Sequence, residues 1–173
     1  MTRGRLALAV AAAMLPLLCQ AQEPTGSLSV KAHPGRAGVF VDGKYLGPAA
    51  NFRIARTYAV AAGEHEVKLI DPRYEELTTK VTVKAGKKTT ISQTLKALPP
   101  PKPPFGRLRT ESTDKFAAVY VNDKYMGHAD EFSNSSQGLL LNPGDYAVKI
   151  VPASGAPITQ SVKIEAGKTV IVK

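Results

Sequence analysis

The chain has 173 residues, a formal net charge of +9, no tryptophan and one cysteine, Cys19. Because that cysteine lies in the N-terminal segment, the rest of the chain has no thiol, which excludes disulfides, thiol catalysis, cysteine-based zinc sites and iron–sulfur clusters there. The basic excess favours acidic partners, although a charged surface that aids solubility explains it equally simply.

Residues 1–21 have the pattern of a signal peptide. Two arginines precede an apolar run over residues 6–18, which is shorter than the roughly 20 residues that a bilayer-spanning helix needs. Small residues at Cys19 and Ala21 predict cleavage after Ala21, so we expect a periplasmic, secreted or cell-surface protein with no transmembrane span. The alternative is a lipoprotein anchored through Cys19, but Leu18 is larger than the residue that normally precedes a lipidated cysteine.

The charge is uneven along the mature chain. Removing the two arginines of the signal from 23 basic residues leaves 21 against 14 acidic ones, a net charge of +7. Residues 22–98 hold 12 Lys/Arg against 7 Asp/Glu (+5), and residues 99–173 hold 9 against 7 (+2). Because an exported protein meets envelope polymers rather than nucleic acid, we expect an anionic glycan or an envelope protein as the partner.

The mature chain is an internal repeat. The segment AGVFVDGKYLG at residues 37–47 aligns with AAVYVNDKYMG at residues 117–127, a spacing of 80. After a one-residue insertion, GEHEVKL at 63–69 aligns with GDYAVKI at 144–150. Two copies of one module, at 22–98 and 106–173, therefore account for nearly all of it.

A proline-rich linker at residues 99–105 separates the copies. Its five prolines remove backbone donors and end both helix and sheet. Such a tract favours polyproline II and makes a semi-rigid spacer of about 20 Å. We expect it to decouple the two copies.

Within each copy the apolar residues alternate with polar ones, as in half-buried strands. Short strands broken by Gly, Pro and Asn predict an all-β fold: two small β-sandwiches of Greek-key, immunoglobulin-like or transthyretin-like type. Asp42-Gly43 predicts a type I′ hairpin in which Val41 faces Lys44, Phe40 faces Tyr45 and Val39 faces Leu46. Asn122-Asp123 predicts the same hairpin in the second copy.

Two groups of side chains are candidate binding surfaces. The hairpins place an aromatic pair on the face opposite the core, where exposed rings would form a platform for sugars; these are Phe40 with Tyr45 and Tyr120 with Tyr125. A basic edge would bind an anionic polymer or protect the sheet edge; its members are Lys80, Lys84, Lys87 and Lys88.

At the quoted segments the chain resembles the PEGA domain, a small β-sandwich module of exported and surface proteins. The carriers are VFVDGKYLG at 39–47, AGEHEV at 62–67 and VKAGK at 83–87. The tetrad Pro-Glu-Gly-Ala is present only as PGRA at 34–37 and DKFA at 114–117, so the second copy is the more divergent. The resemblance implies the fold and an envelope location, without a catalytic activity.

The sequence carries no strong enzymatic signature. His33, His65 and His128 lie outside nucleophile-elbow and HExxH contexts, and the repeat replaces each of them by another residue type. No Asp-rich calcium loop or phosphate-binding glycine loop is present, so no cofactor or metal is expected. We therefore expect a non-enzymatic accessory protein that binds or scaffolds in the envelope. A carbohydrate- or peptidoglycan-binding module is the first alternative, and a hydrolase the second.

Overall fold

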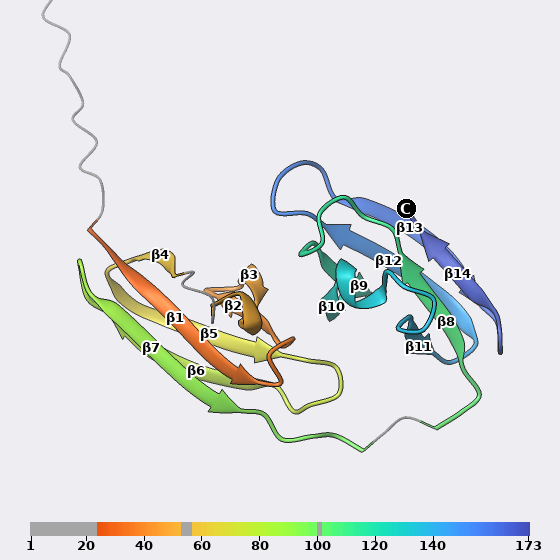
Figure 1. Cartoon of the computed structure of the whole chain (residues 1–173), viewed down its shortest axis with the longest axis horizontal. Coiled ribbons are helices and arrows are strands. Elements are labelled where there is room, and N and C mark those ends of the chain that lie inside the picture. Colours follow the sequence, from red (N-terminus) through yellow and green to blue (C-terminus); the bar gives the residue numbers. More distant parts are fainter. Residues whose placement is uncertain (1–23, 53–56, 100–101) are drawn as a thin grey trace, which may run out of the picture.

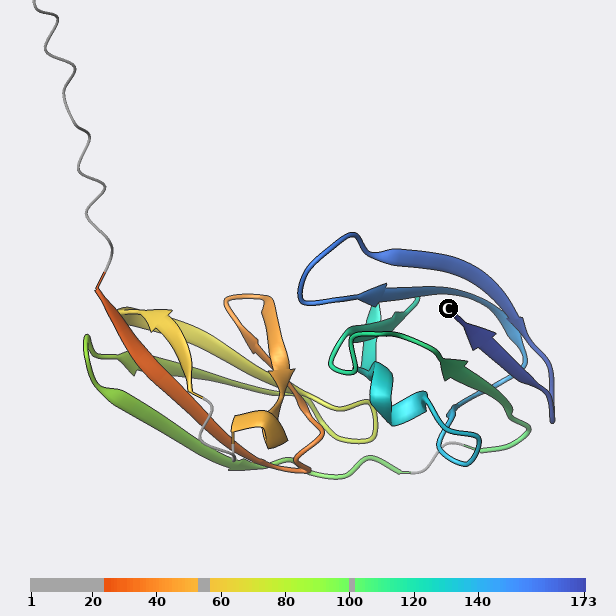
Figure 2. The same cartoon turned by 45° about the horizontal axis from the view of Figure 1, so that its top comes forward.

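The computed structural model describes residues 24–52, 57–99 and 102–173. The predicted signal peptide and Cys19 lie outside the described residues. The protein is elongated, with two all-β modules side by side (Figures 1 and 2). No helix in the described ranges is both long and apolar enough to cross a membrane.

The first module is a sandwich of two sheets with strand orders β4-β1-β7 and β3-β2-β5-β6. β1 pairs antiparallel with β4 and parallel with β7, and the second sheet is antiparallel throughout. The elements are β1 (Thr25–His33), β2 (Gly38–Val41), β3 (Lys44–Pro48), the 3-10 helix η1 (Ala49–Phe52), β4 (Tyr58–Ala61), β5 (Gly63–Ile70), β6 (Leu77–Val83) and β7 (Lys88–Thr94).

The second module repeats this topology with sheets β11-β8-β14 and β10-β9-β12-β13. Its elements are β8 (Gly106–Thr110), β9 (Ala118–Val121), β10 (Lys124–His128), the 3-10 helix η2 (Ala129–Phe132), β11 (Leu139–Leu141), β12 (Gly144–Val151), β13 (Ile158–Ile164) and β14 (Thr169–Val172). The prediction of an all-β fold with two small β-sandwiches is confirmed.

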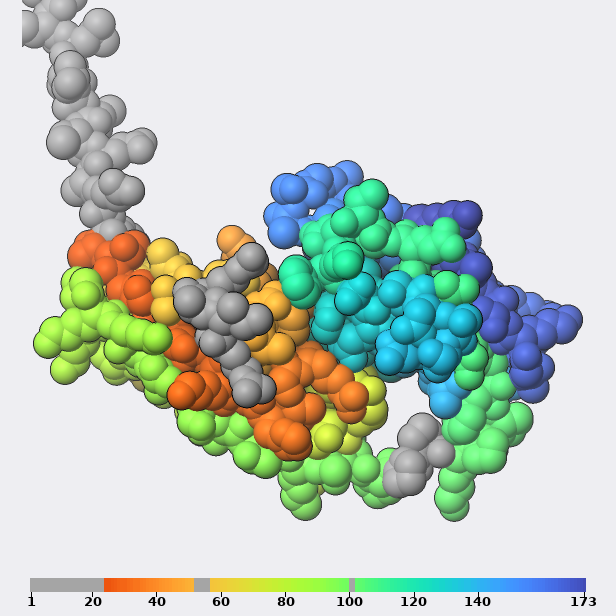
Figure 3. Space-filling view, in the orientation of Figure 1, coloured from red at the N-terminus to blue at the C-terminus, as the bar shows by residue number. Residues whose placement is uncertain are grey.

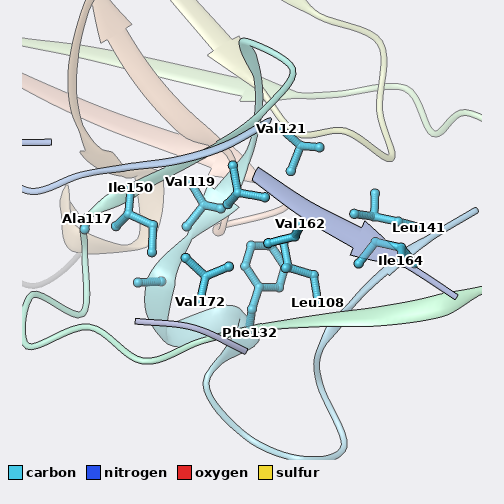
Figure 4. Packing of buried hydrophobic residues seen from close by; sticks show 12 residues of the cluster. Leu108, Ala117, Val119, Val121, Phe132, Leu141, Ile150, Val162, Ile164 and Val172 are labelled. Carbon is cyan, nitrogen blue, oxygen red and sulfur yellow. The ribbon is translucent and has the colours of Figure 1, made fainter. Parts of the chain in front are cut away.

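Each module has its own core, built from the alternating apolar residues of its two sheets. Leu28, Val30, Val67 and Leu69 are fully buried in the first module. In the second, the strands and η2 converge on the ring of Phe132 (Figure 4). Burying one such side chain contributes roughly 1.5–3 kcal/mol to stability. The buried apolar residues of each module therefore stabilise it without a disulfide.

The hairpin prediction is right at the turn and wrong beyond it. Asp42 and Gly43 have φ of 49° and 79°, as a type I′ turn requires, and Phe40 faces Tyr45 as expected. Val39, however, faces Gly47 rather than Leu46, because a register shift separates Val39 from Phe40.

The described ends of the linker are each hydrogen-bonded to the adjoining module. Leu98 donates its backbone N–H to the carbonyl of Arg73 at 2.8 Å, which ties the end of the first module down. The amide of Asn142 donates to the carbonyls of Lys102 at 3.3 Å and Pro104 at 2.9 Å, which ties the linker to the second module. Whether each half folds alone stays a prediction.

Candidate functional site

The hairpins of the two modules meet through their outer faces. In β2, Val39 and Val41 point into the core, so Phe40 must point away from it, beside Tyr45 on β3. The repeat places Tyr120 and Tyr125 in the same way on β9 and β10. The surfaces of the two modules touch along these hairpins (Figure 3).

We call this contact the aromatic joint. The ring of Tyr125 lies 5.2 Å from Phe40, 5.3 Å from Tyr45 and 5.8 Å from Tyr120, measured between ring centroids. The contact with Phe40 is edge-to-face, with an interplanar angle of 87°, the geometry that aromatic quadrupoles favour. Its members are Phe40, Tyr45 and Ile70 from the first module and Ala118, Tyr120, Tyr125 and Val151 from the second.

The joint corrects the prediction of an exposed stacking platform. Phe40 is only 7% exposed and Tyr125 only 4% exposed, while Tyr45 and Tyr120 are half-buried. The hydroxyl of Tyr125 donates to that of Tyr45 at 3.3 Å, and burial raises the pKa of both phenols. The rings were correctly placed on the outer face, but each pair covers the other, so Phe40 and Tyr125 have no face free for a sugar.

Equivalent residues of the repeat form the two halves of the joint. Gly38 and Ala118 occupy the same repeat position, as do Ile70 and Val151. A Cβ at Gly38 would lie 2.6 Å from the ring of Tyr125, which is closer than atoms approach without moving. The small residue therefore permits the ring to pack against the backbone of β2.

A polar contact adds to the joint at its edge. Asp71 is buried and accepts from the guanidinium groups of Arg36 at 3.0 Å and Arg73 at 3.0 Å. Burial alone would raise the pKa of Asp71, but the hydrogen bonds and positive charge of Arg73 hold it below its usual value. Arg73 also reaches Glu131 of the second module at 3.2 Å.

A second polar contact joins β5 to the turn between β2 and β3 in the first module. His65 Nδ1 lies 2.6 Å from Asp42 Oδ2, and Nε2 lies 2.8 Å from the carbonyl oxygen of Ala61. Because a carboxylate and a carbonyl only accept, both ring nitrogens donate when the imidazole is protonated. The hydrogen bond to Asp42 raises the pKa of His65 and lowers that of Asp42.

The second module has an uncharged version of that contact. Tyr146 takes the place of His65 and donates its hydroxyl to the carbonyl of Asn142 at 3.0 Å. Asn122 takes the place of Asp42 and accepts from the backbone N–H of Ala147 at 2.9 Å. The contact is therefore structural in both modules, and only the first version joins an imidazole to a carboxylate.

The four predicted lysines do not form one group. Lys84, Lys87 and Lys88 are exposed together at the turn between β6 and β7. Lys80 lies in the middle of β6, away from the turn, and is paired with Glu64 at 3.5 Å. The basic surface of the first module is thus a three-lysine turn with a neutralised neighbour.

Comparison with known proteins gives the family of the first module. The PEGA domain family matches residues 25–98. The first module is a PEGA domain. Its bounds coincide with β1 at one end and with the backbone bond of Leu98 at the other. The second module lies outside the match, and that it is a divergent PEGA domain stays a prediction, supported by its identical strand order.

Other comparisons add little to the PEGA assignment. No curated protein matches the chain. Among solved structures, the Bacillus anthracis TIE protein is similar with 15% sequence identity and a TM-score of 0.27, over 87% of this chain and 33% of that chain. The chain thus spans about a third of that protein's length.

Sequence reasoning missed the polar edge of the joint. Nothing local marks Arg73 and Glu131 as partners, since they lie in different modules at non-equivalent repeat positions. A usable signal for the joint itself was present: each aromatic pair stands next to a small residue, Gly38 or Ala118, at the same repeat position. Small residues beside large rings are typical of close packing between surfaces.

Proposed function

We propose that the chain is an exported, non-enzymatic accessory protein of the cell envelope, which binds or scaffolds an envelope component through two β-sandwich modules held as one body. The aromatic joint is the observation that carries this proposal. A linker alone would leave the modules free to rotate, whereas buried rings and an ion pair fix their orientation. PEGA domains are typically extracellular or periplasmic, which supports the envelope location.

The contacts of the titratable side chains support a non-enzymatic role. His65 is held between Asp42 and a backbone carbonyl, and His128 lies 2.8 Å from Glu131. Asp71 is saturated by two guanidinium groups. These three side chains are therefore engaged in contacts that hold the fold together.

The joint also bears on the carbohydrate-binding alternative. Stacking on a sugar ring needs an open aromatic face, and Phe40 and Tyr125 are covered by the opposite module. A partner recognised by charge or by the combined surface of both modules fits the molecule better. An envelope protein or an anionic polymer therefore remains the class of partner that we propose.

Export and processing test the first half of the proposal. The full chain, tagged at its C-terminus and made in a bacterial host, should be recovered from the envelope or periplasm without residues 1–21, as intact mass would show. Full-length, unprocessed protein in the cytosol would contradict export. A diacylglycerol-modified Cys19 would instead make it an anchored lipoprotein.

Opening the joint tests the second half. A Gly38→Leu variant should force Tyr125 out of place while the two cores stay folded, and Lys44→Gln, at the exposed end of the neighbouring strand β3, is the matched control. Crosslinking in cells should capture the same envelope component with wild type and control, and less of it with the opened variant. Equal capture by all three would show that a fixed orientation of the modules is not needed.

A further inference from the structure

The turn between β6 and β7 presents three lysines at the end of the molecule farthest from the second module (Figures 1 and 2). We call residues 84–88, with Lys84, Lys87 and Lys88, the lysine turn. The backbone N–H of Lys87 donates to the carbonyl of Lys84 at 3.1 Å, and Gly86 has the positive φ of 66° that such a turn requires. All three lysines are exposed.

The lysine turn is fastened to the start of β1. Gly86 donates its N–H to the carbonyl of Thr25 at 2.8 Å, and Ser27 donates to the carbonyl of Lys87 at 2.9 Å. Gly26 packs so closely beneath the turn that a Cβ there would lie 2.4 Å from the carbonyl oxygen of Lys84. The three charges are thus presented by a fixed backbone, next to the point where the chain continues towards its N-terminus.

The lysine charges are not neutralised by the fold. Among the described residues, no carboxylate lies within ion-pair distance of Lys84, Lys87 or Lys88. The nearest carboxylate on β5, Glu64, is paired with Lys80. The turn therefore carries three positive charges that repel one another and that no internal contact requires.

The second module shows that the same turn folds without them. Its β13–β14 turn has the same backbone bonds, with Lys168 donating to the carbonyl of Glu165 at 3.1 Å and Gly167 at a φ of 72°. Here Glu165 replaces Lys84 and pairs with Lys168 at 2.6 Å, and Thr169 replaces Lys88. The fold needs the glycine and the backbone bonds, not the lysines, so the charge of the first turn has another use.

We propose that the lysine turn docks on an anionic lipid bilayer surface. Flexible ammonium groups on a protruding turn with only Ala85 and Gly86 between them recognise charge rather than shape, which suits a flat layer of phosphate headgroups. Only six residues, 19–24, separate the apolar N-terminal run from Thr25, so they span at most about 20 Å. In the precursor before cleavage after Ala21, or in the lipoprotein alternative, Thr25 and the lysine turn bonded to it lie within about 20 Å of the membrane-bound run; after cleavage the exposed charges alone carry the docking.

The expected strength follows from the number of lysines. One lysine near an anionic bilayer raises the binding constant about fivefold, so three together contribute roughly 100-fold. Because the lysines are exposed, the attraction falls as salt rises and the Debye length shortens. The docking is therefore reversible, and stable attachment needs a second contact.

The test uses the chain beginning at Gln22, which contains every described strand and does not depend on export. Sedimentation with vesicles of phosphatidylcholine, with and without phosphatidylglycerol, should show binding only to the anionic vesicles. Replacing Lys84, Lys87 and Lys88 by Gln should reduce that binding about 100-fold. The matched control, with Lys115, Lys124 and Lys163 replaced by Gln, removes the same charge from exposed positions elsewhere and should retain most of the binding.

A gain of function completes the comparison. Glu165→Lys together with Thr169→Lys gives the second turn the charge pattern of the first and should strengthen vesicle binding, with unchanged near-ultraviolet circular dichroism. Equal loss in the two triple variants would reduce the effect to net charge and overturn the proposal. So would an absence of vesicle binding, or preferential binding of a soluble anionic polysaccharide through the same lysines.

This inference rests on the proposed function, because a cytosolic protein meets a different membrane face, but the two fail separately. Retention of the unprocessed full chain in the cytosol would refute the proposed function and leave vesicle docking intact. Export without any vesicle binding would overturn the docking surface alone.

Discussion

Gly38 offers a direct test of the aromatic joint. A Cβ at this position would lie 2.6 Å from two ring carbons of Tyr125 and 2.7 Å from its hydroxyl oxygen. The φ of Gly38 is outside the left-handed region, and Ala118 occupies the equivalent position, so the backbone itself accepts alanine. Gly38→Ala should therefore act only by displacing the ring.

The magnitude follows from how closely Tyr125 is surrounded. The ring cannot yield freely, because Phe40, Tyr45 and Tyr120 all lie within 5.8 Å of it, measured between centroids. Overpacking a site of this kind costs about 1–3 kcal/mol. Urea unfolding followed by tyrosine near-ultraviolet circular dichroism should show that loss in the free energy of unfolding, and small-angle scattering should show a more extended particle.

A double-mutant cycle decides whether Tyr125 is the cause. In a Tyr125→Ala background the added methyl meets no ring, so Gly38→Ala should cost close to nothing, which leaves a coupling energy of about 1–3 kcal/mol between the two positions. If Gly38→Ala costs the same with and without the ring, or if neither variant changes the scattering profile, the joint does not exist in solution.

Four further predictions concern the polar and backbone contacts. The raised pKa of His65 stabilises the first module below the unfolded value near 6.5, and this stabilisation should be lost as pH rises through the folded pKa; His65→Gln should abolish that pH dependence in urea unfolding. The lowered pKa of Asp42 acts in the opposite range, with its stabilisation present above 3.8 and lost as pH falls through the folded value, so Asp42→Asn should flatten the acid limb. Gly26→Ala should cost about 1–3 kcal/mol in thermal unfolding, because the neighbouring atom is a backbone oxygen that cannot move aside. Glu131→Gln should lose less than about 1 kcal/mol through its contact with Arg73, which is 44% exposed; a double-mutant cycle with Arg73→Gln separates this contact from the one between Glu131 and His128, and a larger coupling energy would mean that the ion pair rather than the rings holds the modules together.

The fold of each module could be predicted because its signals are local. The alternation in β1 and β5 identifies the core residues, and Asp42-Gly43 specifies the turn. The shift between Val39 and Phe40 could not be foreseen, because an extra residue in β3 leaves the alternation of β2 unchanged. Only the hydrogen bonding of the strands decides where such an irregularity falls.

The joint could be predicted only in part, for a different reason. The alternation placed Phe40 and Tyr125 on the outer faces, but which surface covers them depends on residues about 80 positions away. The composition of the linker predicts a stiff spacer between the modules. It does not say where the two ends of that spacer are anchored. Likewise, the basic edge was visible as a run of lysines, but the pairing of Lys80 with Glu64 required the register of β5 and β6.

The two modules are attached at two separate places, by the linker and by the joint. A single attachment acts as a hinge, and each binding event then has to overcome the entropy of a swinging domain. With both attachments in place, a partner that has touched one module meets the other at a preset distance, so the second contact forms as an intramolecular step at high effective concentration. Two weak surfaces on this protein can therefore act with the avidity of one strong surface.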